Sequence, residues 1–293
     1  MSSVSADTME LQTIHDRRPG IVTAFKNRFK HFVPARSHMR LRIFYTRLRF
    51  LALFPVMAGT RHYCPCCRRR FGRFFPDGLR LQVFADKDIV GGAWTPGTRC
   101  PWCWSSERDR LLCAYFEHRP QLLSAGGRVL HLAPEHSLQQ HLRSAHGVSY
   151  VAGDIASPFA MVKMDILMLP LASCSADAVV CNHVLEHVPE DSKAMSEIFR
   201  VLKPGGWAIL QVPIARGIAS TEEDPAVQDP KDRERRYGQF DHVRLYEQQD
   251  YRRRLESAGF EVTIENALEL CGPERVREWR LNAREDVHLC RKP

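Results

Sequence analysis

The sequence predicts an α/β protein built on a doubly wound, mainly parallel sheet of seven strands, preceded by a small cysteine-rich module. The main observation is that short apolar runs alternate with amphipathic stretches from Gly127 to the C-terminus, which is typical of parallel strands joined by crossover helices. The 293 residues suffice for one large domain and a small appendage. The composition, 44% apolar and 26% charged, is that of an ordinary globular protein.

Each expected strand is a short apolar run, and the seven runs are 129–132, 149–152, 162–166, 178–181, 207–212, 260–264 and 287–290. Helices are expected at 135–145, 192–202 and 247–258, with a stop and turn at 203–206. A polar segment, 214–245, interrupts the alternation. Upstream, Ser106 and Asp109 predict the capping box of a helix that ends near Pro120, and 79–84 is expected to be a strand.

Charge divides the chain into a basic N-terminal tail (1–60), a cysteine module (61–104) and a main domain (105–293, core 125–293). The tail holds ten Lys or Arg against three acids, whereas the rest of the chain is nearly neutral. Such a tail can bind a membrane surface, nucleic acid or an acidic partner. Alternatively, it is an arm that only keeps the protein soluble. Apolar residues at Leu41, Phe44, Leu48 and Leu51 predict an amphipathic helix, which either packs on the main domain or contacts a membrane surface.

The ten cysteines are too sparse for a secreted disulfide framework, and no signal peptide is evident. The apolar run 50–58 is too short to span a bilayer, which needs about 20 residues. We therefore expect a cytoplasmic protein whose thiols are free or bound to metal.

Two C-P-x-C turns predict a metal site. They begin at Cys64 and at Cys100, and each presents two thiolates from a turn that its proline stiffens. Four thiolates suit tetrahedral, structural Zn²⁺ in a zinc-ribbon-like module, although iron also accepts four sulfur ligands. The expected ligands are Cys64, Cys67, Cys100 and Cys103, whereas Cys66 is expected to point elsewhere.

Five segments in order resemble class I methyltransferases of the type 11 group, which use S-adenosylmethionine (SAM). The segments are 129–135, 150–154, 165–170, 176–188 and 202–206, and the resemblance covers about 125–293. From about residue 60 the chain is also similar to a subgroup that carries a zinc module. The resemblance implies a Rossmann-like sheet with an antiparallel last strand, SAM as cofactor and 214–245 as the acceptor-side insertion.

In a doubly wound sheet, ligands bind outside the carboxyl ends of the strands. Asp154 ends the second strand, where its carboxylate can take both ribose hydroxyls, although an aspartate there also suits a turn. The resemblance implies that Asp165, beside Ile166, accepts from the adenine amine. It also places Asn182 and His183 where the methyl group is transferred.

The first loop departs from the family, because His131, Ala133, Pro134 and Glu135 stand where glycines are usual. Pro134 removes an amide donor, and Ala133 resists positive φ. Either Glu135 holds the ammonium group of the cofactor, or the site has lost the cofactor.

For the acceptor, His242 and Arg244 share one face of an extended stretch. His242 or His183 can act as a general base, and Arg244 can bind an anion. Alternatively, His242 and Arg244 hold the polar loop to the main domain. Glu107, Arg108 and Arg110 can reach the same cleft.

Three functions remain open at this point. A methyltransferase for a small molecule or glycan is favoured over an RNA methyltransferase, because the body of the chain is nearly neutral. The third is an adaptor with a degenerate cofactor site.

Overall fold

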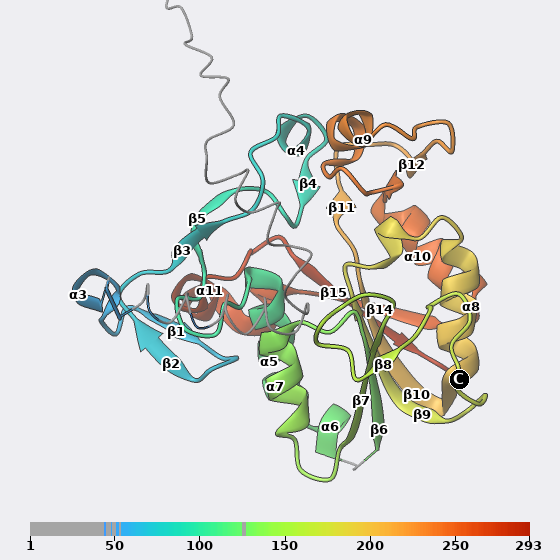
Figure 1. Cartoon of the computed structure of the whole chain (residues 1–293), viewed down its shortest axis with the longest axis horizontal. Helices are drawn as coiled ribbons and strands as arrows, with labels where there is room; N and C mark the ends of the chain where they lie inside the picture. Colours follow the sequence, from blue (N-terminus) through green and yellow to red (C-terminus); the bar gives the residue numbers. More distant parts are fainter. Residues whose placement is uncertain (1–43, 45–47, 49–50, 53, 125–126) are drawn as a thin grey trace, which may run out of the picture.

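A seven-stranded sheet forms the centre of the computed structural model, which describes residues 44, 48, 51–52, 54–124 and 127–293 (Figure 1). The order of its strands is β14-β15-β10-β9-β6-β7-β8. Strand β15 runs antiparallel to its two neighbours, β14 and β10, and all the other neighbouring strands are parallel to each other. The bounds are β6 (Arg128–Leu132), β7 (Ser149–Asp154), β8 (Val162–Lys163), β9 (Ala176–Asn182), β10 (Leu202–Gln211), β14 (Glu261–Asn266) and β15 (Asp286–Arg291). This Rossmann-like sheet, with its antiparallel last strand, confirms the prediction.

Helices cover both faces of the sheet because its strands are apolar on both sides. Neighbouring residues of β9 enter opposite cores: Val179 packs with the helices α8 and α10, and Val180 packs with α5, α7 and α11. Burying one such side chain stabilises the fold by about 1.5–3 kcal/mol. The bounds are α5 (Glu107–His118), α6 (Gln121–Ser124), α7 (His136–Arg143), α8 (Asp191–Val201), α10 (Gln248–Ser257) and α11 (Ala267–Trp279).

The start of α5 is fixed by the predicted capping box. Ser106 accepts from the backbone N–H of Asp109, and the Asp109 carboxylate accepts from the backbone N–H of Ser106 at 3.0 Å. The same carboxylate accepts from the Ser137 hydroxyl at 2.9 Å, which fastens α5 to α7. These bonds fix the residue at which α5 begins, directly after the cysteine module, and hold the start of α5 against α7.

Three details differ from the sequence prediction. The third strand stops at Lys163 instead of residue 166, because the Asp165 carboxylate accepts from the Leu167 N–H and closes a turn. The segment 79–84 is no strand: Leu79 forms one isolated bridge, and α4 (Val83–Asp86) follows. Helix α11 is not predicted, because Gly272, at φ 75°, and the following proline break its pattern.

Two segments far apart in sequence form one cap over the carboxyl end of the sheet. We define the cap as residues 79–93 together with 214–245. Strand β4 (Ile89–Val90) pairs with β11 (Ile214–Ala215), and Val83 and Tyr237 share a small core. The remaining elements here are β12 (Glu222–Glu223), α9 (Pro230–Tyr237) and β13 (Arg244–Leu245).

The cysteine module lies beside α11 and contains two antiparallel strand pairs (Figure 1). Strand β1 (His62–Cys64) pairs with β2 (Arg69–Phe71), and β3 (Phe75–Asp77) pairs with β5 (Thr95–Arg99). The buried Arg110 of α5 donates to the backbone carbonyls of Trp279 and Arg280, at 2.7 Å each. Arg110 therefore joins α5 to the end of α11 and does not reach the cleft.

Most of the predicted amphipathic helix lies outside the described residues. The described part is helical at Phe44, Leu48 and 51–52, and α3 (Phe54–Met57) follows. Phe44, Leu48 and Leu51 are exposed, so the expected packing on the main domain is not found at these three residues. Among the described residues, no helix has the length and apolar character to cross a bilayer.

Candidate active site and cysteine cluster

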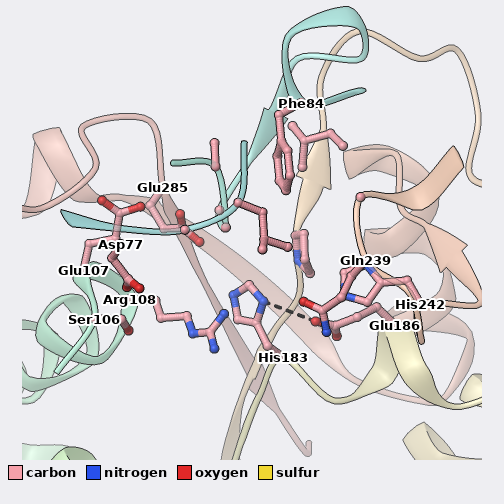
Figure 2. A pocket seen from close by; sticks show the side chains of 18 of the residues that line it. Asp77, Phe84, Ser106, Glu107, Arg108, His183, Glu186, Gln239, His242 and Glu285 are labelled. Atoms are coloured by element: carbon pink, nitrogen blue, oxygen red, sulfur yellow. Dashed lines mark ion pairs between the residues drawn. The ribbon is translucent and has the colours of Figure 1, made fainter. Parts of the chain in front are cut away.

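A cavity of about 290 Å³ lies between the cap, the start of α5 and the end of β9 (Figure 2). Its polar lining comes from segments that are far apart in the chain. The charged or hydrogen-bonding residues are Asp77, Thr98, Arg99, Ser106, Glu107, Arg108, His183, Glu186, His187, Tyr237, Gln239, His242 and Glu285. A cavity of this size and polarity suits a small polar group.

His183 follows the last residue of β9 in a left-handed conformation, with φ 55°. Its N–H donates to the carbonyl of Gln211 at 2.8 Å, and this bond holds the turn. Such a conformation costs a non-glycine residue about 1–3 kcal/mol and is found most often at functional sites. Burial, followed by the Arg108 guanidinium, lowers the pKa of His183 to about 4, so its ring is neutral at pH 7. Figure 2 shows the ring between Arg108 and Glu186.

Glu186 is buried in the 3-10 helix η1 (Leu185–His187), with 1% of its surface exposed. Its Oε1 lies 3.2 Å from His183 Nδ1, yet neither carboxylate oxygen has a partner in hydrogen-bonding geometry. Burial alone would raise the pKa of Glu186, but the neighbouring imidazoles, His183 first, lower it below its usual value. The cavity therefore holds an ionised carboxylate that protein hydrogen bonds leave uncompensated.

Acidic side chains also gather on the opposite wall. Burial and then the Glu107 carboxylate raise the pKa of Glu285 to about 8, so Glu285 is protonated at neutral pH. Its Oε2 is buried without a hydrogen-bond partner. Burial likewise raises the pKa of Glu107. This wall therefore offers a neutral carboxyl group to whatever occupies the cavity.

The two predicted acceptor residues of the cap separate in the structure. His242 lines the cavity, and its Nδ1 lies 3.0 Å from the carbonyl of Tyr237. Arg244 does not line it: Nε donates to Glu223 at 2.7 Å, and the Nη atoms donate to the carbonyls of Leu185, Val188 and Pro189. The prediction that Arg244 binds the acceptor in this cavity is therefore wrong, because its N–H groups already bond to η1 and to the cap.

The first loop adopts the conformation that glycines usually provide. Ala133 has φ 49°, and its N–H donates to the carbonyl of Gly153 at 3.0 Å. Glu135 bridges two strands: Oε2 lies 3.0 Å from His131 Nε2, and Oε1 accepts from the Asn182 amide at 2.6 Å. The structure thus brings His131, Ala133, Glu135 and Asn182 together at the ends of β6 and β9.

The two predicted aspartates lie at the neighbouring strand ends. Asp154 ends β7, and its Oδ1 accepts from the N–H groups of Ala156 and Ser157. No described residue donates to its Oδ2, so the turn uses one oxygen and leaves the other for a ligand. Asp165 is exposed in the turn after β8, beside the half-buried Ile166. Neither aspartate lines the cavity of Figure 2.

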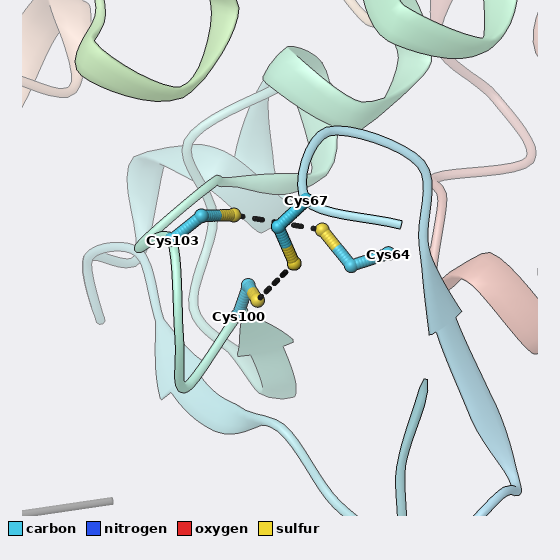
Figure 3. Close-up of side chains that lie close together, drawn as sticks. All are labelled: Cys64, Cys67, Cys100 and Cys103. Carbon is cyan, nitrogen blue, oxygen red and sulfur yellow. Dashed lines mark hydrogen bonds between the residues drawn. The ribbon is translucent and has the colours of Figure 1, made fainter. Parts of the chain in front are cut away.

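Four cysteines, of which Cys64 ends β1, form a compact cluster (Figure 3). The sulfur atoms of Cys64 and Cys103 are 3.6 Å apart, and those of Cys67 and Cys100 are 3.9 Å apart. A tetrahedral zinc ion with about 2.3 Å bonds to sulfur separates its ligands by about 3.8 Å, so the donor set fits that ion. Cys66 points away, as expected, and its sulfur lies 2.8 Å from that of Cys113.

The sequence prediction misses several residues of the cavity, among them Glu186, His187 and Glu285. A signal for Glu186 and His187 exists, because these two polar residues stand between Leu185 and Val188 in the segment that follows the fourth strand. No comparable signal exists for Glu285, which reaches the cavity only because β15 lies beside β10.

Comparison with known proteins gives a consistent result for part of the chain. Residues 117–210 match the family described as a methyltransferase domain. A segment of 94 residues is 33% identical to a probable S-adenosylmethionine-dependent methyltransferase of Mycolicibacterium smegmatis (strain ATCC 700084 / mc(2)155), and it covers 32% of each chain. The chain therefore spans about a third of the length of that curated relative. Both matches support a class I SAM-dependent methyltransferase.

Solved structures with similar chains include two SAM-dependent methyltransferases. The protein from Archaeoglobus fulgidus has a TM-score of 0.42 and 15% identity, covering 63% of this chain and 94% of that chain. The protein from Mesorhizobium loti has a TM-score of 0.39 and 17% identity, covering 60% of this chain and 97% of that chain.

Proposed function

We propose that this chain transfers the methyl group of SAM to a small molecule or glycan that binds in the cavity under the cap. The observation that carries the proposal is the arrangement of acidic side chains at the carboxyl ends of β6 and β7 beside a small polar cavity at the end of β9. In this proposal 105–293 carry the reaction, and 61–104 support the wall that contains Glu107 and Arg108.

The hydrogen-bond acceptors at the strand ends suit SAM. Glu135, fixed by His131 and Asn182, is placed to accept from the cofactor's ammonium group, and the free Oδ2 of Asp154 can accept from ribose hydroxyls. Asp165 can accept from the adenine amine, with Ile166 as an apolar neighbour. Ala133 adopts the left-handed φ that a glycine would adopt at this position. When bound, SAM supplies a methyl group on a positively charged sulfur.

The chain's own residues then have to place the acceptor and accept its proton. The cap encloses the acceptor and holds it at a fixed distance from the strand ends. The acceptor and the cofactor then react as two positioned groups and do not have to meet by diffusion. We assign His183 as the first candidate for the general base, because its neutral ring lines the cavity and its Nε2 has no protein partner. His242 is the second candidate.

The experiment is a calorimetric titration of zinc-replete protein with S-adenosylhomocysteine and SAM. We expect micromolar binding that Asp154→Ala weakens at least tenfold, because the Asp154 carboxylate is proposed to accept hydrogen bonds from both ribose hydroxyls. Asp177→Ala is the matched control, since Asp177 lies at the amino end of β9, where it contacts Lys203.

Binding that survives Asp154→Ala would remove this residue from the cofactor site. A folded, zinc-loaded protein that binds neither compound would overturn the enzyme proposal and leave the adaptor as the better function. Circular dichroism of each variant separates loss of binding from loss of folding.

A further inference from the structure

Three side chains of the cavity lie close enough to share one ion. The ligand atoms of Glu186, His187 and His242 are all within 4.8 Å of one another. Two of these residues come from η1, and the third comes from the cap. The cluster is separate from the four cysteines, which lie in another part of the molecule.

Glu186 is the reason to expect an ion here. Its carboxylate is almost fully buried, and neither oxygen accepts a hydrogen bond. A buried carboxylate without hydrogen bonds is strongly destabilising, so native proteins pair such groups or use them to coordinate metals. His183 Nδ1 is near Oε1 but is not aligned for a hydrogen bond, so the second oxygen and most of the charge remain uncompensated.

Both histidines have a protein neighbour at Nδ1, which leaves Nε2 for an ion. His242 Nδ1 lies 3.0 Å from the carbonyl of Tyr237, and this contact requires Nδ1 to carry the proton. His187 Nδ1 lies 3.4 Å from the carboxylate of Asp241, while its Nε2 lies 3.9 Å from Glu186 Oε1. Carbonyl or carboxylate partners on the far nitrogen orient metal-bound histidines in the same way, leaving Nε2 free for the metal.

The backbone around the cluster is held independently of any ion. The Val243 N–H donates to the carbonyl of Glu186 at 2.9 Å, and Arg244 donates to the carbonyls of Leu185 and Val188. These bonds keep η1 and the cap segment at His242 in register. The three side chains are therefore brought together by the fold itself, which reduces the cost of ordering them on binding.

We propose that Glu186, His187 and His242 bind a divalent transition-metal ion whose open positions face the cavity and take an oxygen of the acceptor. Two imidazoles and one carboxylate suit Zn²⁺ and its first-row neighbours, and three protein ligands leave at least one position open. A metal-bound hydroxyl loses its proton more readily than a free one. Acceptors with a hydroxyl or carboxylate oxygen are therefore the favoured class, and this part of the inference rests on the proposed function.

The test uses the full chain with zinc already in the cysteine cluster and Co²⁺ alone as the probe. Calorimetry and visible absorption should show one further equivalent of Co²⁺, without the thiolate bands that a cysteine site would give. His242→Ala and Glu186→Gln should each weaken Co²⁺ binding at least tenfold. His146→Ala, which removes an exposed histidine elsewhere, is the control and should bind as the wild type does.

Two results would overturn the metal site: a zinc-loaded wild type that takes up no Co²⁺, or variants that bind it unchanged. Glu186→Gln keeps the shape of the side chain, so it remains informative where His242→Ala is unstable. Titration of the same samples with S-adenosylhomocysteine separates the two proposals. Cofactor binding without Co²⁺ binding removes only the metal, whereas Co²⁺ binding without cofactor binding removes only the methyltransferase.

Discussion

At the scale of single residues, the site depends on two left-handed residues that are not glycine. Ala133 and His183 have φ 49° and 55°, and they follow the ends of adjacent strands, β6 and β9. The sequence argues against positive φ at Ala133, yet the bond from its N–H to the Gly153 carbonyl outweighs the strain. The loop therefore keeps the backbone shape of a glycine-rich loop without its glycines.

Ala133→Gly tests that strain. We expect a change between neutral and about 1 kcal/mol of added stability, because glycine relieves the left-handed conformation but adds freedom to the unfolded chain. Ala152→Gly is the matched control in the buried part of β7, and it should destabilise by about 1 kcal/mol. Urea unfolding measures both, and equal destabilisation by the two variants would show that Ala133 is not strained.

At the scale of elements, Arg244 fastens the cap to η1 and the residues that follow it. Its side chain is 5% exposed and contacts β12 through Glu223, while its Nη atoms reach the carbonyls around η1. Because these bonds are buried, losing one costs more free energy than at the surface. A buried carbonyl or carboxylate that loses its donor cannot form a replacement hydrogen bond with water.

Arg244→Met should therefore destabilise the protein by about 3 kcal/mol, since it leaves buried acceptors without a partner. Arg252→Met is the control, because Arg252 forms an exposed pair with Glu256 at 2.7 Å, and such pairs contribute about 1 kcal/mol or less. Thermal unfolding without any ligand measures both. An Arg244→Met protein as stable as the wild type would restore the idea that Arg244 serves an acceptor.

At the scale of the whole molecule, the sequence predicts the sheet well and the cavity poorly. Strands such as 178–181 are recognisable because their apolar runs are buried on both faces, and the position of Asp154 is predictable because parallel strands end at one edge of the sheet. Helix α11 is missed because Gly272 interrupts it. Glu285 is missed because its place depends on how strands distant in sequence pair, which no local pattern encodes.

The cysteine cluster acts at this scale too, because β1 packs on α11 and α5 leads directly into the core. Cys64→Ser should lose the zinc and destabilise by about 3 kcal/mol or more, or roughly 6–12 °C in Tm. Cys174→Ser removes an exposed thiol and should leave both the metal content and the Tm unchanged. Metal analysis and calorimetry check this, and a stable, metal-free wild type would contradict it.

The pairing of β4 with β11 has a consequence for how the chain folds. Val90 contacts Ile214 across more than a hundred intervening residues, and those residues contain five of the seven strands of the sheet. Closing so long a loop is slow unless the intervening chain has already become compact. During synthesis from the N-terminus, β4 therefore has no pairing strand until β11 has been made, and the cavity under the cap is completed only after most of the sheet has formed.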